Sequence, residues 1–376
     1  MLYIPNDEET AYRDGAIPIF CVTDDPHDSP VQQGACNAIY GTYNNVLTGM
    51  TYESGFKGFG IGSMTSVINL NVTRIINWAN VQDGNSVWLG FHDSVDAPWK
   101  NPFTVTHWVK LRDNVKFERP TITQNKHVKI TGYGYTRVFD KPITDKHLVT
   151  GTAIKSKLES MLPCRVYEFF DEMLKGVGMS LYSSAFTNAQ VQITETPFGE
   201  NSEKITCRDI LDWVLDFTGT YPWLVTTSNG FQVQLRTLVA NGSLDEDEYP
   251  QIAKMEVMRN DSFISKVSVV GENWRKSLSG STSDDVVMRE ITIQSNPLFE
   301  SLGSTSARDA AATAVCQKFL SKKCAEFSIT VAAGWQYEAG DYIEFKDANG
   351  DVRGGWLTYV KHTMGGLSEL KCELAS

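Results

Sequence analysis

The chain has 376 residues, of which 41% are hydrophobic and 21% are charged, so its length fits about two or three folded domains with substantial cores. Its formal net charge of -11 disfavours nonspecific binding to nucleic-acid phosphates over most of the surface. No apolar stretch approaches the roughly 20 residues of a membrane span, and the polar, acidic start does not have the pattern of a signal peptide. We therefore expect a globular protein that is made in a cytoplasm and does not insert into a membrane.

The cysteines agree with a reducing compartment. They are scattered, odd in number and without a CxxC pair, a distribution that favours buried free thiols over a disulfide framework. The seven are Cys21, Cys36, Cys164, Cys207, Cys316, Cys324 and Cys372.

Residues 1–150 have the pattern of antiparallel β-strands. Apolar and polar residues alternate over Thr104–Leu111 and again from Val128 to Tyr135, and a period of two is typical of half-buried strands. Gly, Asn, Asp and Pro interrupt these runs, as turns require. This segment predicts a barrel or sandwich, and its opening forty residues predict an arm or a long loop.

The pattern changes after Gly151, where two amphipathic helices are predicted. In the first, residues from Val166 to Leu174 form one apolar stripe, and Gly176 and Gly178 follow where a helix would end. The second begins at Thr206, which can cap a helix while Asp209 completes a capping box. Its apolar face and its end consist of Ile210, Leu211, Val214, Leu215 and Gly219.

A hairpin is predicted after the second helix. The strands Trp223–Thr227 and Phe231–Leu235 flank Asn229-Gly230, a pair that tolerates the positive φ angles of tight turns. Together with the two helices it makes a small α+β domain over residues 151–245.

Strand patterns return over residues 246–376, the third expected domain. We interpret Ser277–Asp285 as an exposed loop, and we expect one helix over Ala310–Phe319, capped by Ser306. A closing hairpin is expected to run from Tyr342 through Asn349-Gly350, with a further turn at Gly365-Gly366 before the last strand.

Sequence patterns typical of catalysis, metal binding or cofactor binding are absent. There is no HExxH, no His-x-His and no GxSxG. His92 lies beside Asp93 in an adjacent histidine–carboxylate pair, and the Gly58–Gly62 run does not match a dinucleotide or phosphate loop. We predict no catalytic, metal-binding or cofactor-binding residues, and we expect the six histidines to be surface or packed residues. They are His27, His92, His107, His127, His147 and His362.

Carboxylate pairs and aromatic residues are the remaining candidates for glycan chemistry. A glycan hydrolase needs two acids facing a groove, whereas Asp284-Asp285 and residues 245–248 lie in polar stretches that we interpret as solvated loops. Aromatic residues can stack on sugars, but four tryptophans lie among strand residues, which favours burial in a core. These are Trp88, Trp99, Trp108 and Trp223.

Four short motifs follow one another over residues 206–367. They are the helix opening Thr206–Leu211, Ser295–Leu298 before an Ala-rich helix over 305–319, the strand entry Glu338–Asp341, and the closing hairpin Lys346–Gly350 with its later Gly-Gly-Leu turn. In this order they resemble the hub proteins of tailed bacteriophages, especially those of Gram-positive hosts and their prophages.

The resemblance implies an α+β, mostly β fold, in which two barrel-like β domains flank the small α+β domain. It also implies a homotrimeric ring with pseudo-six-fold symmetry in the virion tail tip or baseplate, assembled in the host cytoplasm. Such a hub joins the tail tube to a spike or tip protein, contacts the distal tail protein and the tape measure protein, and lets DNA pass in transit. It would not be an enzyme and would need no cofactor.

Two other classes remain open. A carbohydrate-binding or receptor-binding tail module predicts exposed aromatic clusters in a groove. A tail-associated cell-wall lytic enzyme predicts a catalytic domain after the hub, for which we expect no room because the chain ends at Ser376. A tail-like bacteriocin is expected to have the same hub architecture as a phage.

Overall fold

The structure is a computed structural model in which two parts of the chain are described to different extents. Before residue 128 it describes the segments 17–23, 36–41, 47–55, 65–72, 86–92, 107–110, 115–117 and 121–122. Thereafter it describes residues 128–199, 202–227, 230–237, 244, 249–280, 287–320, 322–331, 337–363 and 367–375.

The described part of the chain is mostly β, as expected, and most of its strands belong to one large sheet. The strands from the first part of the chain are β3 (Leu47–Gly55), β4 (Thr65–Val72), β7 (Val115–Phe117), β8 (Thr121–Ile122) and β9 (Val128–Gly134). Those from the last part are β15 (Ile252–Val270), β16 (Arg275–Ser279), β17 (Val287–Gln294), β18 (Lys323–Val331), β19 (Tyr342–Lys346), β20 (Val352–Thr363) and β21 (Ser368–Ala375).

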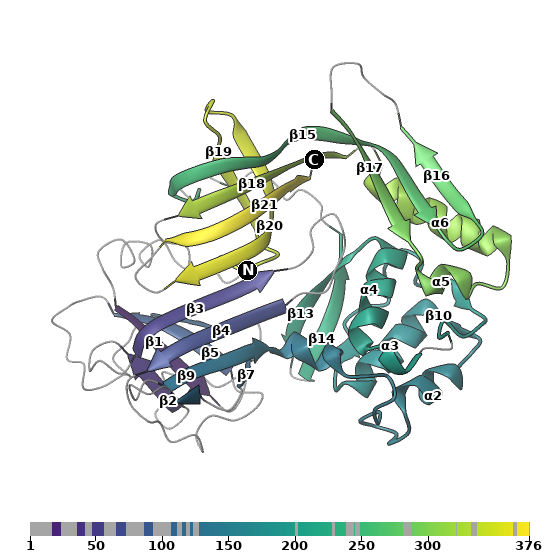
Figure 1. Ribbon diagram of the computed structural model, residues 1–376, viewed down its shortest axis with the longest axis horizontal. Coiled ribbons are helices and arrows are strands. Elements are labelled where there is room, and N and C mark those ends of the chain that lie inside the picture. Colours follow the sequence, from purple (N-terminus) through teal and green to yellow (C-terminus); the bar gives the residue numbers. More distant parts are fainter. Residues whose placement is uncertain are drawn as a thin grey trace.

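These strands form a 12-stranded sheet with the order β16-β15-β18-β21-β20-β3-β4-β9-β7, to which β17, β19 and β8 add by pairing with β15, β20 and β9. Among these pairings that of β15 with β17 is parallel and the others are antiparallel. The antiparallel pair β20–β3 joins the first and last parts of the chain edge to edge. In Figure 1 the strands from β15 to β9 lie side by side in this order. The expected arrangement of two separate barrels stays a prediction.

A second sheet, also from the first part of the chain, consists of four strands in the order β2-β1-β5-β6. They are β1 (Ile17–Thr23), β2 (Cys36–Gly41), β5 (Ser86–His92) and β6 (His107–Lys110). The prediction that the opening forty residues form only an arm or loop is therefore wrong, because β1 and most of β2 fall within them. β1 pairs with β5 through seven residues whose hydrogen bonds are long-range, so local composition did not indicate them.

The helices gather at one end of the molecule, beside several short strands (Figure 1). They are α2 (Ile154–Glu159), α3 (Val166–Gly176), α4 (Cys207–Thr218), α5 (Pro297–Glu300) and α6 (Thr305–Phe319), with the 3-10 helices η3 (Tyr135–Asp140) and η4 (Ser202–Lys204). The short strands are β10 (Cys164–Arg165), β11 (Ser180–Leu181), β12 (Gln192–Ile193), β13 (Tyr221–Thr227) and β14 (Gly230–Arg236). We call this end of the molecule, with β16 and β17, the helical lobe.

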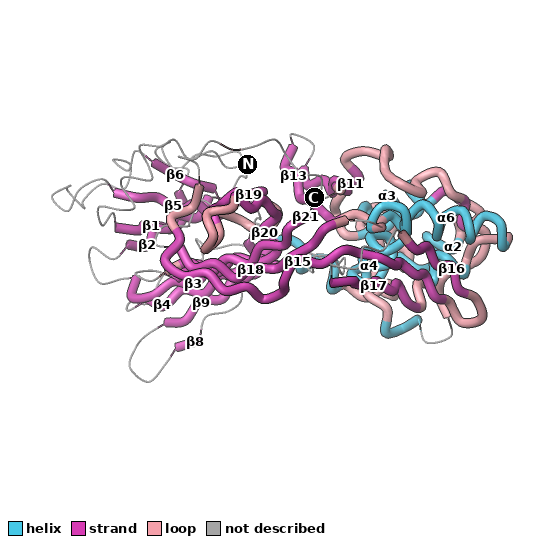
Figure 2. The backbone as a smooth tube through the Cα atoms, turned by 90° about the horizontal axis from the view of Figure 1, so that it is seen from above, coloured by secondary structure: helices cyan, strands magenta, loops and turns pink. Residues whose placement is uncertain are grey.

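One long strand connects the two ends. β15 runs from the large sheet into the helical lobe, as Figure 2 shows from above. Its second half contributes Ile264, Val267 and Val269 to the same hydrophobic core as helices α3, α4 and α6. The helical lobe is therefore built from residues of all three expected domains, because η3 belongs to the first.

Helix α4 follows from the residues that were expected to form it. The Thr206 side chain accepts a hydrogen bond from the Asp209 amide, and the Asp209 side chain accepts one from the Thr206 amide, which completes the capping box. Gly219 ends the helix in the left-handed conformation, with φ 63. Ile210 and Leu211, like Val214 and Leu215, are buried in the core that also holds Leu224 and Val233 of the β13–β14 hairpin.

The helix and hairpin predictions hold in most other places. α3 buries its apolar stripe, and α6 spans the residues expected for the Ala-rich helix. β13 pairs with β14, and β19 pairs with β20 across the Asn349-Gly350 turn. The Gly365-Gly366 turn and the Gly58–Gly62 run lie outside the described residues.

Three local predictions were wrong. The N-cap of α6 is Ser304, whose hydroxyl accepts a hydrogen bond from the Ala307 amide at 3.2 Å, and Ser306 lies inside the first turn. The start of the expected Ser277–Asp285 loop is part of strand β16, where the Ser277 hydroxyl bonds the Ser268 hydroxyl at 2.8 Å. Tyr135 begins the 3-10 helix η3 instead of continuing the preceding strand.

Within the described residues, no helix combines the length and the apolar character that crossing a membrane requires.

Candidate functional site: the polar face of the large sheet

The large sheet has one polar and one apolar face in the region around the β20–β3 junction. Directly paired residues point to the same side of a sheet, so the register defines each face across neighbouring strands. One row on the polar face runs from β15 to β3 through Lys254, Thr330, Glu369, Lys361 and Glu53. The next row on this face contains Glu256, Ser328, Lys371 and Tyr359. We call these nine residues the polar face.

The opposite face of the same strands is buried. Its rows contain Val257, Phe327, Cys372 and Leu357, and then Met255, Ile329, Leu370, Val360 and Ser54. Within these rows, all the residues from β18, β21, β20 and β3 are buried. The alternation of polar and apolar residues along each strand therefore places one face of the sheet toward the core.

Charged residues of the polar face pair with neighbours on the same strand or on an adjacent one. Lys361 Nζ lies 3.4 Å from Glu53 Oε1, and the Tyr359 hydroxyl donates a hydrogen bond to Glu53 Oε2 at 3.2 Å. Lys254 forms an ion pair with Glu256. Burial, together with the nearby Glu53 carboxylate, raises the pKa of Tyr359 to about 12, so this hydroxyl keeps its proton and stays a donor.

The third lysine of the polar face lies over an aromatic ring. Lys371 Nζ is 5.3 Å from the centroid of the Tyr359 ring, within the range of a cation–π contact. The polar face therefore holds three lysines against the glutamates Glu53, Glu256 and Glu369, for a net charge of 3 − 3 = 0. Two of its three lysines are paired with a carboxylate and the third lies over an aromatic ring, so the surface offers no run of unpartnered cations to bind phosphates.

A buried histidine lies on the apolar face of the sheet at the junction of β3 and β20. His362 is 0% exposed, and its ring stacks on that of Tyr52 with 6.0 Å between the centroids. Its Nε2 lies 2.8 Å from the Tyr337 carbonyl oxygen, and its Nδ1 lies 2.8 Å from the Ser368 hydroxyl. Burial lowers the pKa of His362 to about 4, so the ring is neutral near pH 7.

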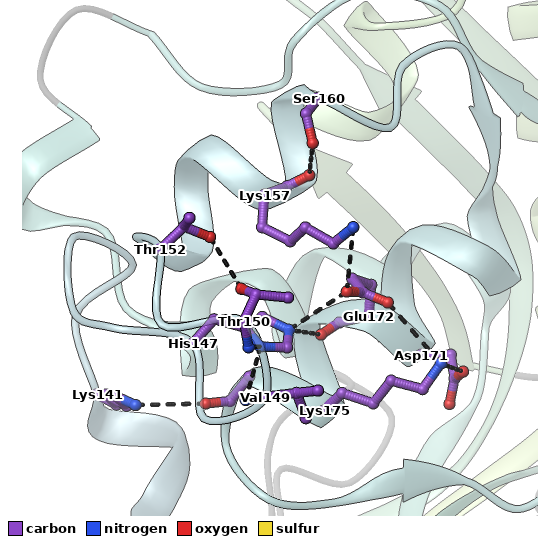
Figure 3. A network of polar contacts seen from close by, with 11 residues as sticks. Lys141, His147, Val149, Thr150, Thr152, Lys157, Ser160, Asp171, Glu172 and Lys175 are labelled. Atoms are coloured by element: carbon purple, nitrogen blue, oxygen red, sulfur yellow. Dashed lines mark hydrogen bonds and ion pairs between the residues drawn. The ribbon is translucent and has the colours of Figure 1, made fainter.

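The second described histidine organises a turn in the helical lobe (Figure 3). His147 Nδ1 accepts hydrogen bonds from the amides of Val149 and Thr150 at 3.1 and 3.3 Å. Nε2 therefore carries the ring proton and donates it to the Glu172 carbonyl oxygen at 3.1 Å. Both ring nitrogens are occupied in holding the turn over 147–152, which is a structural role.

The carboxylate beside His147 is shared with two lysines. Glu172 Oε1 lies 3.4 Å from His147 Nε2 and 3.6 Å from Lys157 Nζ, while Oε2 lies 3.8 Å from Lys175 Nζ. Figure 3 shows the three side chains converging on this carboxylate from α2, α3 and the turn. The Glu172 carboxylate therefore holds α2, α3 and the turn together through these polar contacts.

Other sequence candidates are placed only in part. Asp93, Asp284-Asp285 and residues 245–248 lie outside the described residues, as do the side chains of His27, His92, His107 and His127. In the part of the chain that the structure describes, no three His, Cys, Asp or Glu side chains are grouped as metal ligands. The expectation that the chain is not an enzyme stays a prediction.

Tyr182 is 49% exposed, whereas Trp223 and Trp356 are packed. Trp223 is 6% exposed and Trp356 is 7% exposed, and the Trp356 ring contacts those of Tyr221 and Tyr342 with centroids 6.2 and 5.4 Å apart. The prediction that Trp223 fills a core is confirmed. The side chains of the other three tryptophans predicted to be buried are not described: Trp88, Trp99 and Trp108.

The five described cysteines are buried free thiols, as expected. Burial raises the pKa of Cys164 and Cys316 to about 11 and that of Cys207 to about 12, so these thiols stay protonated. Thiolate nucleophiles need the opposite shift.

Sequence reasoning did not identify the polar face. The alternation from Glu369 to Glu373 is visible in the sequence, and so is that from Tyr359 to Lys361. The pairing of β20 with β3, more than 300 residues earlier, is not visible, because it depends on long-range contacts.

Comparisons with known proteins complete this description. No family model matches the chain, and no curated protein sequence matches it. Among solved structures it is similar to the prophage tail protein gp18 from Listeria monocytogenes EGD-e, with 9% identity, a TM-score of 0.47 and coverage of 95% of this chain and 94% of that one. The 43 kDa tail protein of prophage MuSo2 from Shewanella oneidensis has 10% identity, a TM-score of 0.48 and coverage of 95% and 97%.

A third similar structure is the E. coli c3393 protein, a component of the type VI secretion system described as structurally similar to the T4 bacteriophage tail proteins gp27 and gp5. It has 8% identity, a TM-score of 0.39 and coverage of 87% of this chain and 73% of that one. The chain is thus similar in structure to tail proteins, the class whose motifs its sequence resembles. Similarity of this degree leaves the function to be inferred from the chain's own residues.

Proposed function

We propose that the chain is a structural hub of a bacteriophage tail tip or baseplate. Three copies form a ring with pseudo-six-fold symmetry, which joins the tail tube to the spike or tip and lets DNA pass. The distal tail protein and the tape measure protein are the further expected neighbours. In this proposal the chain is assembled into the virion and catalyses no reaction.

The observation that carries the proposal is the polar face of the large sheet. A lumen for DNA needs a wall that is wetted by water but does not hold phosphates. The polar face meets both requirements, because two of its three lysines are ion-paired and its net charge is zero, while the chain as a whole carries -11.

The sheet also supports a ring in which each chain contributes two similar β units. Strands from the first part of the chain continue the sheet of the last part at the β3–β20 junction, where residues 51–55 of β3 keep the same division into a polar and an apolar face. One chain therefore offers two β units side by side, and three such chains supply six. The three parts expected from the sequence, 1–150, 151–245 and 246–376, fit this plan as two β units with a smaller α+β unit between them.

A charge reversal on the polar face tests the proposed lumen. Glu369→Lys converts an exposed carboxylate into a fourth lysine in each chain, and three copies would add six units of positive charge to the wall. We expect tails of normal length and appearance but slower DNA ejection, with the slowing reduced by added salt, because screening weakens the attraction to phosphates.

The matched control is Glu195→Lys, which makes the same charge change at an exposed position of the helical lobe. It should eject DNA at the wild-type rate. Equal ejection rates for wild type and Glu369→Lys at low salt would count against this face as the channel wall.

A further inference from the structure

Strand β15 is buried along one half and exposed along the other. In its second half, Ile264 and Val267 are 0% exposed, and they lie in the core of the helical lobe. In its first half, the adjacent residues Val257 and Met258 are 53% and 54% exposed. Residues 254–257 pair regularly with β18, so the side chains of Glu256 and Val257 point to opposite faces of the strand. Both are more than half exposed, so this half of β15 is uncovered on both faces.

The exposed half of β15 is also an edge of the large sheet. At Ser262 the strand pairs with Cys324 of β18 and with Val287 of β17, so these two strands lie on opposite edges of β15. Over residues 252–258 the pairing with β18 continues, and among the described strands none lies on the other edge. In Figure 1 β15 lies at the upper end of the row of strands that continues through β18, β21 and β20.

The apolar layer of the sheet is open at this edge. Val257 pairs with Phe327, which is 4% exposed, and Met255 pairs with Ile329, which is 0% exposed. These two β15 residues thus extend the apolar face to the edge strand. There Val257 is 53% exposed, and no further described strand pairs along this edge. An exposed apolar edge is a template for pairing with a further strand.

The chain also has a second sheet edge that fits such a contact. The opposite end of the large sheet is formed by β7 and β8, which pair with β9 on the edge away from β4. Inside the chain, β3 and β20 already show that a sheet from the first part can pair with a sheet from the last part while both faces continue. The β7–β8 end of a second copy of this chain therefore offers the open edge a strand backbone with which to pair.

We propose that the edge of β15 over residues 252–258 pairs with the β7–β8 end of the large sheet in a second copy of the chain. The contact is head to tail, because it joins two different surfaces, and repeated contacts of this type close a ring when the rotation allows it. This inference rests on the proposed ring and names the strands that hold its copies together.

A cross-linking experiment tests the pairing directly. We would combine Val257→Cys with Lys116→Cys at the centre of β7, and treat both the purified chain at rising concentration and isolated tails with a short bis-maleimide. The double variant should give covalent dimers and trimers. Each single variant should give no covalent oligomer, and the two single variants together control for the chain's natural cysteines.

Each other outcome overturns the inference. Dimers of the Val257→Cys single variant would show that two β15 edges meet each other instead. A cross-link from Val257→Cys to another tail protein would assign the edge to that protein. Absence of a band specific to the double variant, in solution and in tails, would exclude this pairing.

A second pair of variants measures the contribution of the edge to association. Val257→Lys with Met258→Lys places two charges at exposed positions, and Lys is a residue that protects natural edge strands. We expect association of copies to weaken at least about tenfold, measured by native mass spectrometry of the purified chain and by incorporation into tails. The control, Leu148→Lys with Val149→Lys, changes two residues that are 65% and 74% exposed on the helical lobe, and it should associate normally.

Failure of this inference and failure of the proposed function are distinguishable. Copies that assemble normally with the Val257→Lys and Met258→Lys changes place the contact elsewhere and leave the hub role intact. A double cysteine variant that cross-links in solution while the chain is missing from tails would retain the pairing and contradict the hub.

Discussion

Tyr52 on β3 and His362 on β20 occupy paired positions across the junction of the first and last parts of the chain, and their rings stack with an interplanar angle of 11°. The pair lies on the buried face, directly beneath the lysine and glutamate residues of the polar face. Its neutral, hydrogen-bonded histidine makes the junction sensitive to pH.

The stability of the fold should fall as the pH drops from about 6.5 to about 4. Burial lowers the pKa of His362 to about 4, from an ordinary value of 6.5. Between these values the unfolded chain binds a proton that the folded chain excludes, so the free energy of unfolding rises with pH in this window. At about 1.4 kcal/mol per pKa unit, the difference amounts to roughly 3 kcal/mol.

Urea unfolding at several pH values between about 7 and 4 measures this contribution. Because carboxylates titrate in the same range, the comparison is with His362→Gln, which should lose stability less steeply on acidification. Parallel curves for the two proteins would show that His362 does not couple folding to pH.

The corrected N-cap of α6 gives a matched pair of variants. Ser304→Ala removes the hydroxyl that accepts the hydrogen bond of the Ala307 amide, which should cost about 1 kcal/mol of stability. Ser306→Ala removes an exposed hydroxyl inside the helix and should be nearly neutral, within about 0.5 kcal/mol. Denaturant midpoints measure the stability of both variants. A larger loss of stability for Ser306→Ala would instead support Ser306 as the cap, as predicted from the sequence.

Helix α4 should depend on its buried leucine. Leu211 is 1% exposed in the core of the helical lobe, so Leu211→Ala leaves a cavity and should cost about 2–5 kcal/mol. In a subunit held partly by its neighbours, this loss should appear as failed tail assembly. Leu148→Ala, at an exposed position, is the control, and normal tails with altered adsorption from Leu211→Ala would place α4 at a receptor instead of within a scaffold.

Two glycines with similar backbone angles should respond differently to alanine. Gly340 and Gly350 have φ of 92 and 85, so alanine is strained at both, by about 1–3 kcal/mol. At Gly340 the new methyl carbon would also lie 2.4 Å from the Trp223 ring, whereas at Gly350 it would meet nothing within 4 Å. Thermal unfolding should therefore show a clearly larger loss for Gly340→Ala, and equal losses would mean that Trp223 moves aside freely.

The parts of the fold that the sequence predicted are those in which several local signals coincide. At α4 a capping box, an apolar stripe and a terminal glycine mark the same twelve residues. At α6 three consecutive residues, Ser304, Thr305 and Ser306, all have hydroxyls suited to capping, so the helix was predicted but its first residue was not.

The features that carry the proposed function depend on contacts between distant residues. Glu53 and Tyr359 are 306 positions apart in the chain, and no local pattern indicates that they share a hydrogen bond. The parallel pairing of β15 with β17 and the exposed half of β15 also depend on how distant parts of the chain pair. Strand alternation predicted that each strand has two faces, but not which strands join to make one surface.

The most direct test of the hub is a symmetry-resolved reconstruction of the tail tip. It should show three copies of the chain in a ring, with Glu53, Lys361 and Glu369 facing the channel and the helical lobes outside it. Six copies, a single asymmetric copy, or a ring whose channel is lined by other residues would contradict the proposal.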